Sequence, residues 1–249
     1  MTGLVVYYGT TSPDAEWAVA LSDTDVVLQP YHPILMERAY RRTFPGASRF
    51  VYLNPTTIDP WRLQRRRSRP PLLVDRDEWG LPRLNLESAA GWDCAIEEAA
   101  VAAGAGQEEL HGIFLDDVDR MPDHQVRRFI TELSDRLGWM PRLFVNRGFA
   151  LWATLPDIDA VLIEDVRGAQ TRQPDAEGPA RWVREVVAPA VIAARARGAR
   201  VHRIDYADTA CAGTAVDEGL PPELIESEWM DAPRLLHAWP SGARGHEDR

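Results

Sequence analysis

The chain has 249 residues, a hydrophobic fraction of 45% and a formal net charge of -10. This length suits one large α/β domain, and the hydrophobic fraction excludes wholesale disorder. No apolar run approaches the roughly 20 residues that a bilayer-spanning helix needs, so we expect no contact with a membrane. The negative charge argues against nonspecific nucleic-acid binding and favours neutral or cationic small ligands.

The cysteines and histidines predict neither a disulfide framework nor a resident metal. Cys94 and Cys211 are the two cysteines, and neither they nor the histidines have metal-ligand spacing. We therefore expect no cofactor. The first predicted strand begins at Gly3 without the basic start and apolar core of a signal peptide, which predicts a cytoplasmic protein.

Short β-branched and aromatic segments alternate with helical patterns along the chain. The predicted strands are residues 3–9, 25–29, 49–55, 83–87, 110–115, 142–148, 160–166 and 200–206. Helices are predicted over 14–21, 34–43, 92–103 and 179–197, with a kink at Pro189, and a short helical turn over 149–155. The best-marked helix has an apolar face at helical spacing and ends at Gly138; this face comprises Val126, Phe129, Ile130, Leu133 and Leu137.

Eight strands that alternate with helices predict a single (β/α)8 barrel, because every crossover is long enough for parallel pairing. We assign residues 1–240 to this barrel, with a short or irregular C-terminal segment, and residues 241–249 to a polar, disordered tail. A doubly wound open sheet is the rival, but no strand is followed by a glycine-rich dinucleotide or phosphate signature.

In a barrel, the carboxyl ends of all strands line one pocket. The predicted strand ends bring together a polar, carboxylate-rich set that suits a sugar: Tyr8, Gln29, Asn54, Asn85, Asp116, Asn146, Glu164 and Asp205, with Tyr206 beside it. Glycoside hydrolysis needs two carboxyl groups that flank the scissile bond. Asp116 and Glu164 are the best candidate pair, and the two-residue period of a strand turns Asp117 and Asp165 to the other face.

Four motifs also resemble those of the endo-α-1,4-polygalactosaminidase-like glycoside hydrolases of family 114. They are Gly-Ile-Phe-Leu-Asp-Asp-Val-Asp at 112–119, Phe-Val-Asn-Arg-Gly-Phe at 144–149, Val-Leu-Ile-Glu-Asp at 161–165 and Arg-Ile-Asp-Tyr at 203–206. The resemblance implies a barrel that acts on α-linked galactosamine polymers. It implies that Asp116 is the nucleophile and Glu164 the acid/base of a retaining reaction.

Some strand ends differ from the pattern that the resemblance leads us to expect. Gln29, Asn54 and Asn85 stand where a carboxylate, a small residue and an aspartate are expected. These differences keep open a biosynthetic lyase or isomerase, in which Asp116 and Glu164 move protons or hold a metal, and a non-catalytic sugar-binding barrel. A divalent cation held by Asp116, Asp117 and Asp119 is a separate alternative. Two interpretations of the basic run Arg62–Arg69 stay open: it binds an anionic ligand, or it forms a solvated loop.

Overall fold

A computed structural model of the protein describes residues 3–7, 24–28, 48–58, 62–63, 73–77, 80–104, 110–164 and 177–204. In this part of the chain, seven strands form one sheet in which every pair is parallel. In spatial order they are β1 (Gly3–Tyr7), β2 (Thr24–Leu28), β3 (Ser48–Leu53), β6 (Gly112–Leu115), β7 (Arg142–Asn146), β8 (Ile158–Glu164) and β9 (Arg200–Ile204). Because all are parallel, their carboxyl ends meet at one edge of the sheet.

The prediction that residues 83–87 form the fourth strand of the barrel is wrong. β5 (Pro82–Leu84) pairs antiparallel with β4 (Leu73–Arg76) in a separate two-stranded sheet, and β3 pairs directly with β6. Strands inside a parallel sheet are continuous apolar runs, as in β6, whereas residues 83–87 alternate polar with apolar. β5 instead bonds the segment beyond β3, where the Leu84 N–H donates to the Thr56 carbonyl over 2.8 Å.

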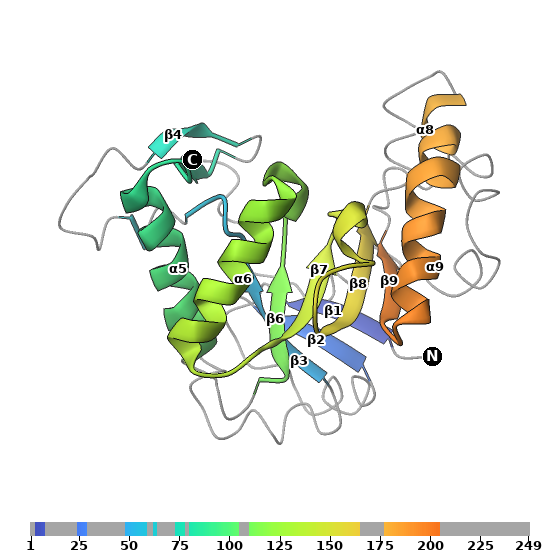
Figure 1. Cartoon of the computed structure of the whole chain (residues 1–249), viewed down its shortest axis with the longest axis horizontal. Coiled ribbons are helices and arrows are strands. Elements are labelled where there is room, and N and C mark those ends of the chain that lie inside the picture. Colours follow the sequence, from blue (N-terminus) through green and yellow to red (C-terminus); the bar gives the residue numbers. More distant parts are fainter. Residues whose placement is uncertain are drawn as a thin grey trace, which may run out of the picture.

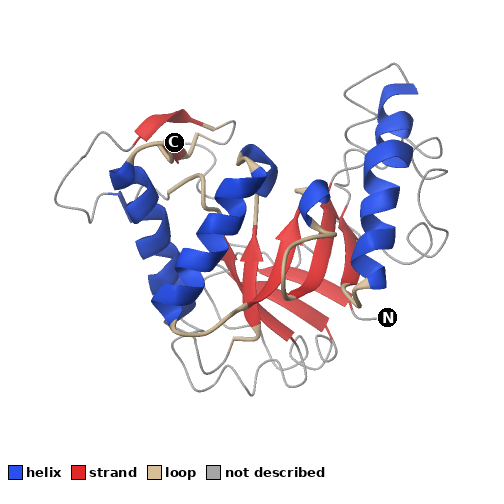
Figure 2. Ribbon diagram, in the orientation of Figure 1, coloured by secondary structure: helices blue, strands red, loops and turns tan. Residues whose placement is uncertain are grey.

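In Figure 1, α5 (Ala89–Gly104) and α6 (Asp123–Leu137) lie to the left of the strands, and α8 (Glu177–Trp182) and α9 (Ala188–Ala196) lie to the right. Residues of all four helices join one apolar cluster, so these helices cover the same face of the sheet. Figure 2 shows the same division between red strands and blue helices. The apolar face predicted for α6 is buried at Val126, Phe129, Ile130 and Leu133. Gly138 ends this helix with φ 75°, as predicted, because a left-handed backbone is easiest for glycine. The helix predicted over 92–103 is α5.

The helix predicted over 179–197 is one continuous helical run whose distortion lies just before Pro189. Residues Val183–Val187 form a π-helical turn between α8 and α9. Proline lacks an N–H and its ring presses on the carbonyl four residues earlier, and the wider π-turn accommodates this. The predicted kink at Pro189 therefore takes the form of a π-turn.

The sheet separates two apolar layers, as the two-residue period requires. The outer layer packs the strands against the helices. The inner layer receives side chains from all seven strands: Leu4, Val27, Phe50, Phe114, Phe144, Ala160, Leu162 and Ile204. Since strands from both ends of the sheet contribute to one inner cluster, the sheet is curved around it. The fold is therefore α/β and barrel-like.

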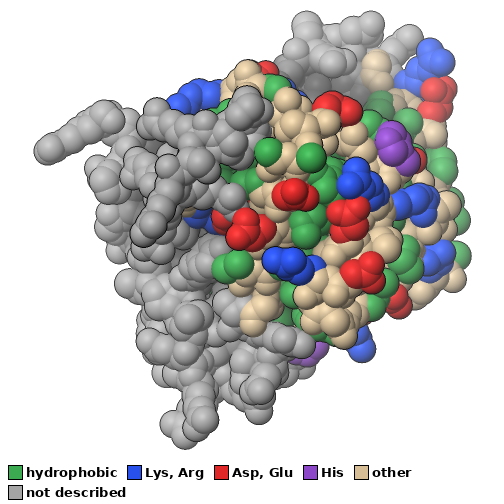
Figure 3. Space-filling model, turned by 60° about the vertical axis from the view of Figure 1, so that its left-hand side comes forward, with side chains coloured by type: hydrophobic (Ala, Val, Ile, Leu, Met, Phe, Trp, Pro, Cys, Tyr) green, Lys and Arg blue, Asp and Glu red, His purple; other side chains and the backbone are tan. Residues whose placement is uncertain are grey.

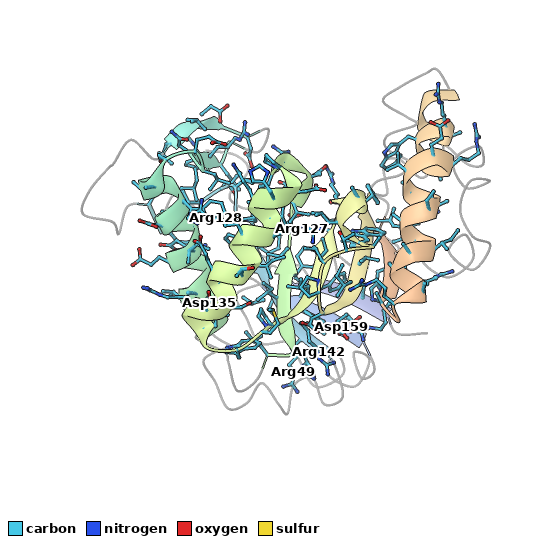
Figure 4. All side chains as sticks on the ribbon, in the orientation of Figure 1. Arg49, Arg127, Arg128, Asp135, Arg142 and Asp159 are labelled. Carbon is cyan, nitrogen blue, oxygen red and sulfur yellow. The ribbon has the colours of Figure 1, made fainter. Side chains whose placement is uncertain are left out.

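Polar side chains join β2 to β9 at the amino ends of the strands. Arg200 donates two hydrogen bonds to Asp25, from Nε over 2.8 Å and from Nη2 over 3.0 Å, and also contacts Asp159. His202 Nε2 lies 2.7 Å from Asp25 Oδ2, and Asp25 is fully buried. Figure 4 labels Asp159 and Arg142 in this region. This network links the two flanks of the curved sheet without a strand pairing.

Several predictions fall outside the described residues: the helices at 14–21 and 34–43, and the tail at 241–249. The assignment of residues 1–240 to one domain stays a prediction. Among the helices that the structure describes, none is both long enough and apolar enough to cross a membrane.

Candidate active site

Three polar side chains meet at the carboxyl ends of β6, β7 and β8. Asn146 Nδ2 donates one hydrogen bond to Asp116 Oδ1 and another to Glu164 Oε2, each over 2.7 Å. Each of the three follows a residue of the inner cluster by two positions: Phe114, Phe144 and Leu162, in that order. Because side chains alternate along a strand with a period of two, the three polar side chains share the inner side of the sheet. The structure thus brings together the two predicted catalytic carboxylates, with Asn146 between them.

Tyr52 completes the hydrogen bonding of Asp116 and was missed by the sequence analysis. Its hydroxyl donates to Asp116 Oδ2 over 2.6 Å, and the Asp117 N–H donates to Asp116 Oδ1 over 2.9 Å. Tyr52 lies in β3, two residues before the predicted Asn54, so it has the same parity along the chain. That parity could have identified it, but nothing in the sequence shows that β3 neighbours β6.

The chain turns sharply after each of two site residues. Asp117 follows Asp116 with φ 52°, and Arg147 follows Asn146 with φ 59°. Left-handed backbone at a residue other than glycine costs about 1–2 kcal/mol, and strained residues of this kind cluster at functional sites. The Trp152 indole N–H donates to the Arg147 carbonyl over 2.6 Å, which holds the second turn in place.

Asp117, which lies beyond the end of β6, contacts Asn54 and Arg120. Its Oδ2 accepts a hydrogen bond from Asn54 Nδ2 over 3.1 Å and faces Arg120 Nε at 3.4 Å. Asn54 Oδ1 accepts from both the N–H and the hydroxyl of Thr56. Asn54, predicted to bind substrate, therefore lies beside the site and holds Asp117.

Burial raises the pKa of Asp116 to about 6, and the nearby charges of Asp117 and Glu164 add to this effect. Hydrogen bonds from Tyr52 and Asn146 stabilise the carboxylate and act in the opposite direction. Burial also raises the pKa of Asp117, although Arg120 opposes it. The arrangement leaves Asp116 ionised in most molecules at pH 7 and protonated below about pH 6.

Arg147 forms an ion pair with Glu164. Its Nε lies 3.6 Å from Glu164 Oε2, and its side chain is about one-third exposed. Burial alone would lower the pKa of Arg147, but Glu164, Asp119, Asp117 and Asp116 together hold it above its usual value.

Other predicted site residues lie elsewhere or outside the described part. Asn85 forms a turn before α5, where its Oδ1 accepts from the Glu87 N–H over 3.2 Å. Four predicted residues lie outside the described residues: Tyr8, Gln29, Asp205 and Tyr206. Arg62, the first residue of the basic run, pairs with Glu98 on α5 over 2.8 Å, so it is attached to a helix.

The metal-assisted alternative finds no support in the described residues. Among them, no group of three or more His, Cys, Asp or Glu side chains is arranged to hold a metal ion. In particular, Asp119 is exposed, and Asp117 pairs with Asn54 and Arg120. Acidic and basic side chains are interspersed over the described surface shown in Figure 3.

The fold and the site define a class: a barrel-like α/β protein with paired carboxylates at the carboxyl ends of its strands. No protein-family model matches the sequence, and no curated protein matches it. Among solved structures, the glycoside hydrolase domain of PelA from Pseudomonas aeruginosa is similar, with a TM-score of 0.53 and 21% identity over 82% of this chain and 83% of that one. A variant of that domain is equally similar, with a TM-score of 0.52.

A second solved protein shares the fold. Aspergillus fumigatus Ega3, in complex with galactosamine, has a TM-score of 0.56 and 13% identity, over 82% of this chain and 77% of that one. At these identities the likeness concerns the fold. The resemblance found in the sequence motifs therefore agrees with an independent comparison of structures.

Proposed function

We propose that this protein is a glycoside hydrolase of the family 114 type, which cleaves an α-glycosidic bond of an amino sugar with retention of configuration. Asp116 is the nucleophile and Glu164 is the acid/base. One observation carries the proposal: both carboxylates accept a hydrogen bond from the same nitrogen, Asn146 Nδ2. Glycoside hydrolysis needs two carboxyl groups close together, and here both lie at the carboxyl ends of the strands of a barrel-like sheet.

The distance between the carboxylates supports retention. Asp116 Oδ1 and Glu164 Oε2 each lie 2.7 Å from Asn146 Nδ2, so their separation is at most twice that distance, 5.4 Å. Retaining enzymes hold their carboxyl groups about 5–5.5 Å apart, whereas inverting enzymes need roughly 6.5–9.5 Å to admit water. A covalent intermediate on Asp116 fits this geometry.

The charges around the site support a cationic sugar. Among the described residues, the four carboxylates Asp116, Asp117, Asp119 and Glu164 outnumber the two guanidinium groups beside them, those of Arg120 and Arg147, so an ammonium group is attracted. An ammonium group is a hydrogen-bond donor without acceptors, and carboxylates are its natural partners. The solved relative bound to galactosamine agrees with this choice of substrate.

Reducing-end release from galactosamine oligomers tests the function. We expect the wild-type protein to release reducing ends. In both Asp116→Asn and Glu164→Gln we expect kcat to fall at least about a thousandfold, since each variant removes one carboxyl group of the catalytic pair. Surface variant Asp135→Asn on α6 is the matched control and keeps full activity; Figure 4 labels this residue. Undiminished release from either active-site variant rejects the role of that residue.

The pH profile distinguishes the two roles. The pKa of Asp116 is raised to about 6, so a nucleophile at this position loses activity as the pH falls through 6. If Asp116 were instead the general acid, activity would fall as the pH rises through 6. A descending alkaline limb near 6 that disappears in Asp116→Asn therefore reverses the assignment.

Closure of the sheet into a complete barrel and a cytoplasmic location are further parts of the proposal. An experimental structure of the whole chain tests the first, and cell fractionation tests the second. Tyr8, Gln29, Asp205 and Tyr206 remain proposed contacts to the sugar.

A further inference from the structure

The two oxygens of Asp116 are not equivalent. Oδ1 accepts two hydrogen bonds, from Asn146 Nδ2 over 2.7 Å and from the Asp117 N–H over 2.9 Å. Oδ2 accepts one, from the Tyr52 hydroxyl over 2.6 Å. A carboxylate oxygen has two in-plane lone pairs. The described residues therefore occupy both lone pairs of Oδ1 and one of Oδ2, which leaves the second lone pair of Oδ2 for a further bond.

The Tyr52 ring is held in place by packing. It stacks on Phe114, with ring centroids 5.8 Å apart and an interplanar angle of 21°. Phe114 in turn contacts Phe144 edge to face, with centroids 4.9 Å apart. All three rings belong to the inner apolar layer, so the hydroxyl is delivered to Asp116 by a rigid part of the fold.

We propose that Tyr52 is a positioning residue that orients Asp116 so that Oδ2, and not Oδ1, bonds to the anomeric carbon of the sugar. This inference rests on the function proposed above and adds a residue and an atom to it. Tyr52 acts through Asp116, because its hydroxyl is directed at the carboxylate.

The reaction balances with Oδ2 as the nucleophile. In the first step the Oδ2–C1 bond forms, the C1–O glycosidic bond breaks, and Glu164 gives its proton to the departing oxygen. In the second step water gives a proton to Glu164, its oxygen bonds to C1, and the electron pair of the Oδ2–C1 bond returns to Asp116. The Tyr52 hydroxyl donates to Oδ2 most strongly when that oxygen is charged, which stabilises Asp116 as the leaving group.

The titration of Asp116 provides a second readout. The groups that face it are Asp117 beyond β6, Glu164 in β8, Tyr52 in β3 and Arg147 beyond β7. The Tyr52 hydrogen bond favours the charged carboxylate, so its removal raises the pKa of Asp116 above about 6. A residue that served packing alone would leave this pKa unchanged.

Tyr52→Phe tests the proposal, because it removes the hydroxyl and keeps the ring. We expect kcat to fall roughly tenfold to a hundredfold with little change in KM, and the acid limb of the kcat/KM profile to move to higher pH. NMR titration of Asp116 in carboxyl-labelled protein should show the same upward shift. Thr131→Val, which removes an exposed hydroxyl from α6, is the control and changes neither quantity.

Three outcomes overturn the proposal. Unchanged kcat and an unchanged Asp116 titration in Tyr52→Phe reject the positioning role, and a rise in KM alone assigns Tyr52 to substrate binding instead. A crystal structure of the adduct trapped with a 5-fluoro galactosaminyl fluoride should show the C1–Oδ2 bond; a bond to Oδ1 refutes the choice of atom. If the wild-type protein releases no reducing ends, the proposed function fails, while the titration of the empty protein still decides whether Tyr52 holds Asp116.

Discussion

Asn146 is the residue whose replacement tests the geometry of the site most directly. Leucine has the same branching as asparagine and no donors, so Asn146→Leu removes the two 2.7 Å hydrogen bonds while nearly preserving the shape of a side chain that is 2% exposed. Each hydrogen bond to a charged group is worth about 1.5–3 kcal/mol. Both carboxylates lose their shared donor.

The expected loss of activity follows from these energies. If the transition state loses the equivalent of one such bond, kcat falls roughly 10- to 150-fold, since about 1.4 kcal/mol corresponds to a factor of ten. The Asn146 bond also favours the charged form of Asp116, so the pKa of that carboxyl rises above about 6 and the acid limb of activity moves upward.

The assay is the initial rate of reducing-end release from galactosamine oligomers between about pH 4 and about pH 9, roughly two units below and three units above the expected limb near 6. Asp135→Leu is the matched control, because it makes a similar polar-to-apolar change on the exposed face of α6. Thermal unfolding of both variants checks that the protein is folded at the assay temperature. A kcat within about twofold of wild type, with an unmoved acid limb, would refute the view that Asn146 holds the pair together.

Two further variants test how the fold supports the site. Asp25→Asn breaks a buried ion pair with Arg200 and His202, and we expect a loss of about 3–5 kcal/mol in urea unfolding at pH 7. Burial alone would raise the pKa of Asp25, but Arg200 and His202 lower it below its ordinary value of 3.8. The ion pair therefore stabilises the folded protein above that pH, and this stabilisation is lost as the pH falls further. Equal stability of the wild-type and variant proteins at pH 7 would exclude a stabilising role for this link between β2 and β9. Gly148→Ala adds a Cβ 2.5 Å from Val118 Cγ2 at φ 61°, which should cost about 2–4 kcal/mol by the same measurement and also lower kcat; a neutral effect would contradict this packing.

Local signals in the sequence predicted most of the elements near the site. The apolar face and the terminal Gly138 identified α6, and the short apolar runs identified β6, β7 and β8. Strand parity then placed Asp116 and Glu164 on one side of the sheet, because side chains alternate with a period of two. The four-motif resemblance anticipated the fold that the solved structures share.

Local signals in the sequence did not predict which strands are neighbours in the sheet. Residues 83–87 looked like a strand, and part of them is one, but hydrogen bonding to Thr56 and β4 removes it from the main sheet. Which strands pair depends on contacts between residues far apart in the chain, and propensity does not contain that information.

The sequence by itself determined that acidic and amide side chains follow short buried strands, because alternation and strand ends are local properties of the chain. Only the tertiary structure decided that Asn146 bridges Asp116 and Glu164, and that Tyr52 reaches Asp116 from β3. A hydrogen bond depends on distance and direction to within a few tenths of an ångström. The curvature and register of the whole sheet set those distances, and they arise from every strand packing on the common inner cluster.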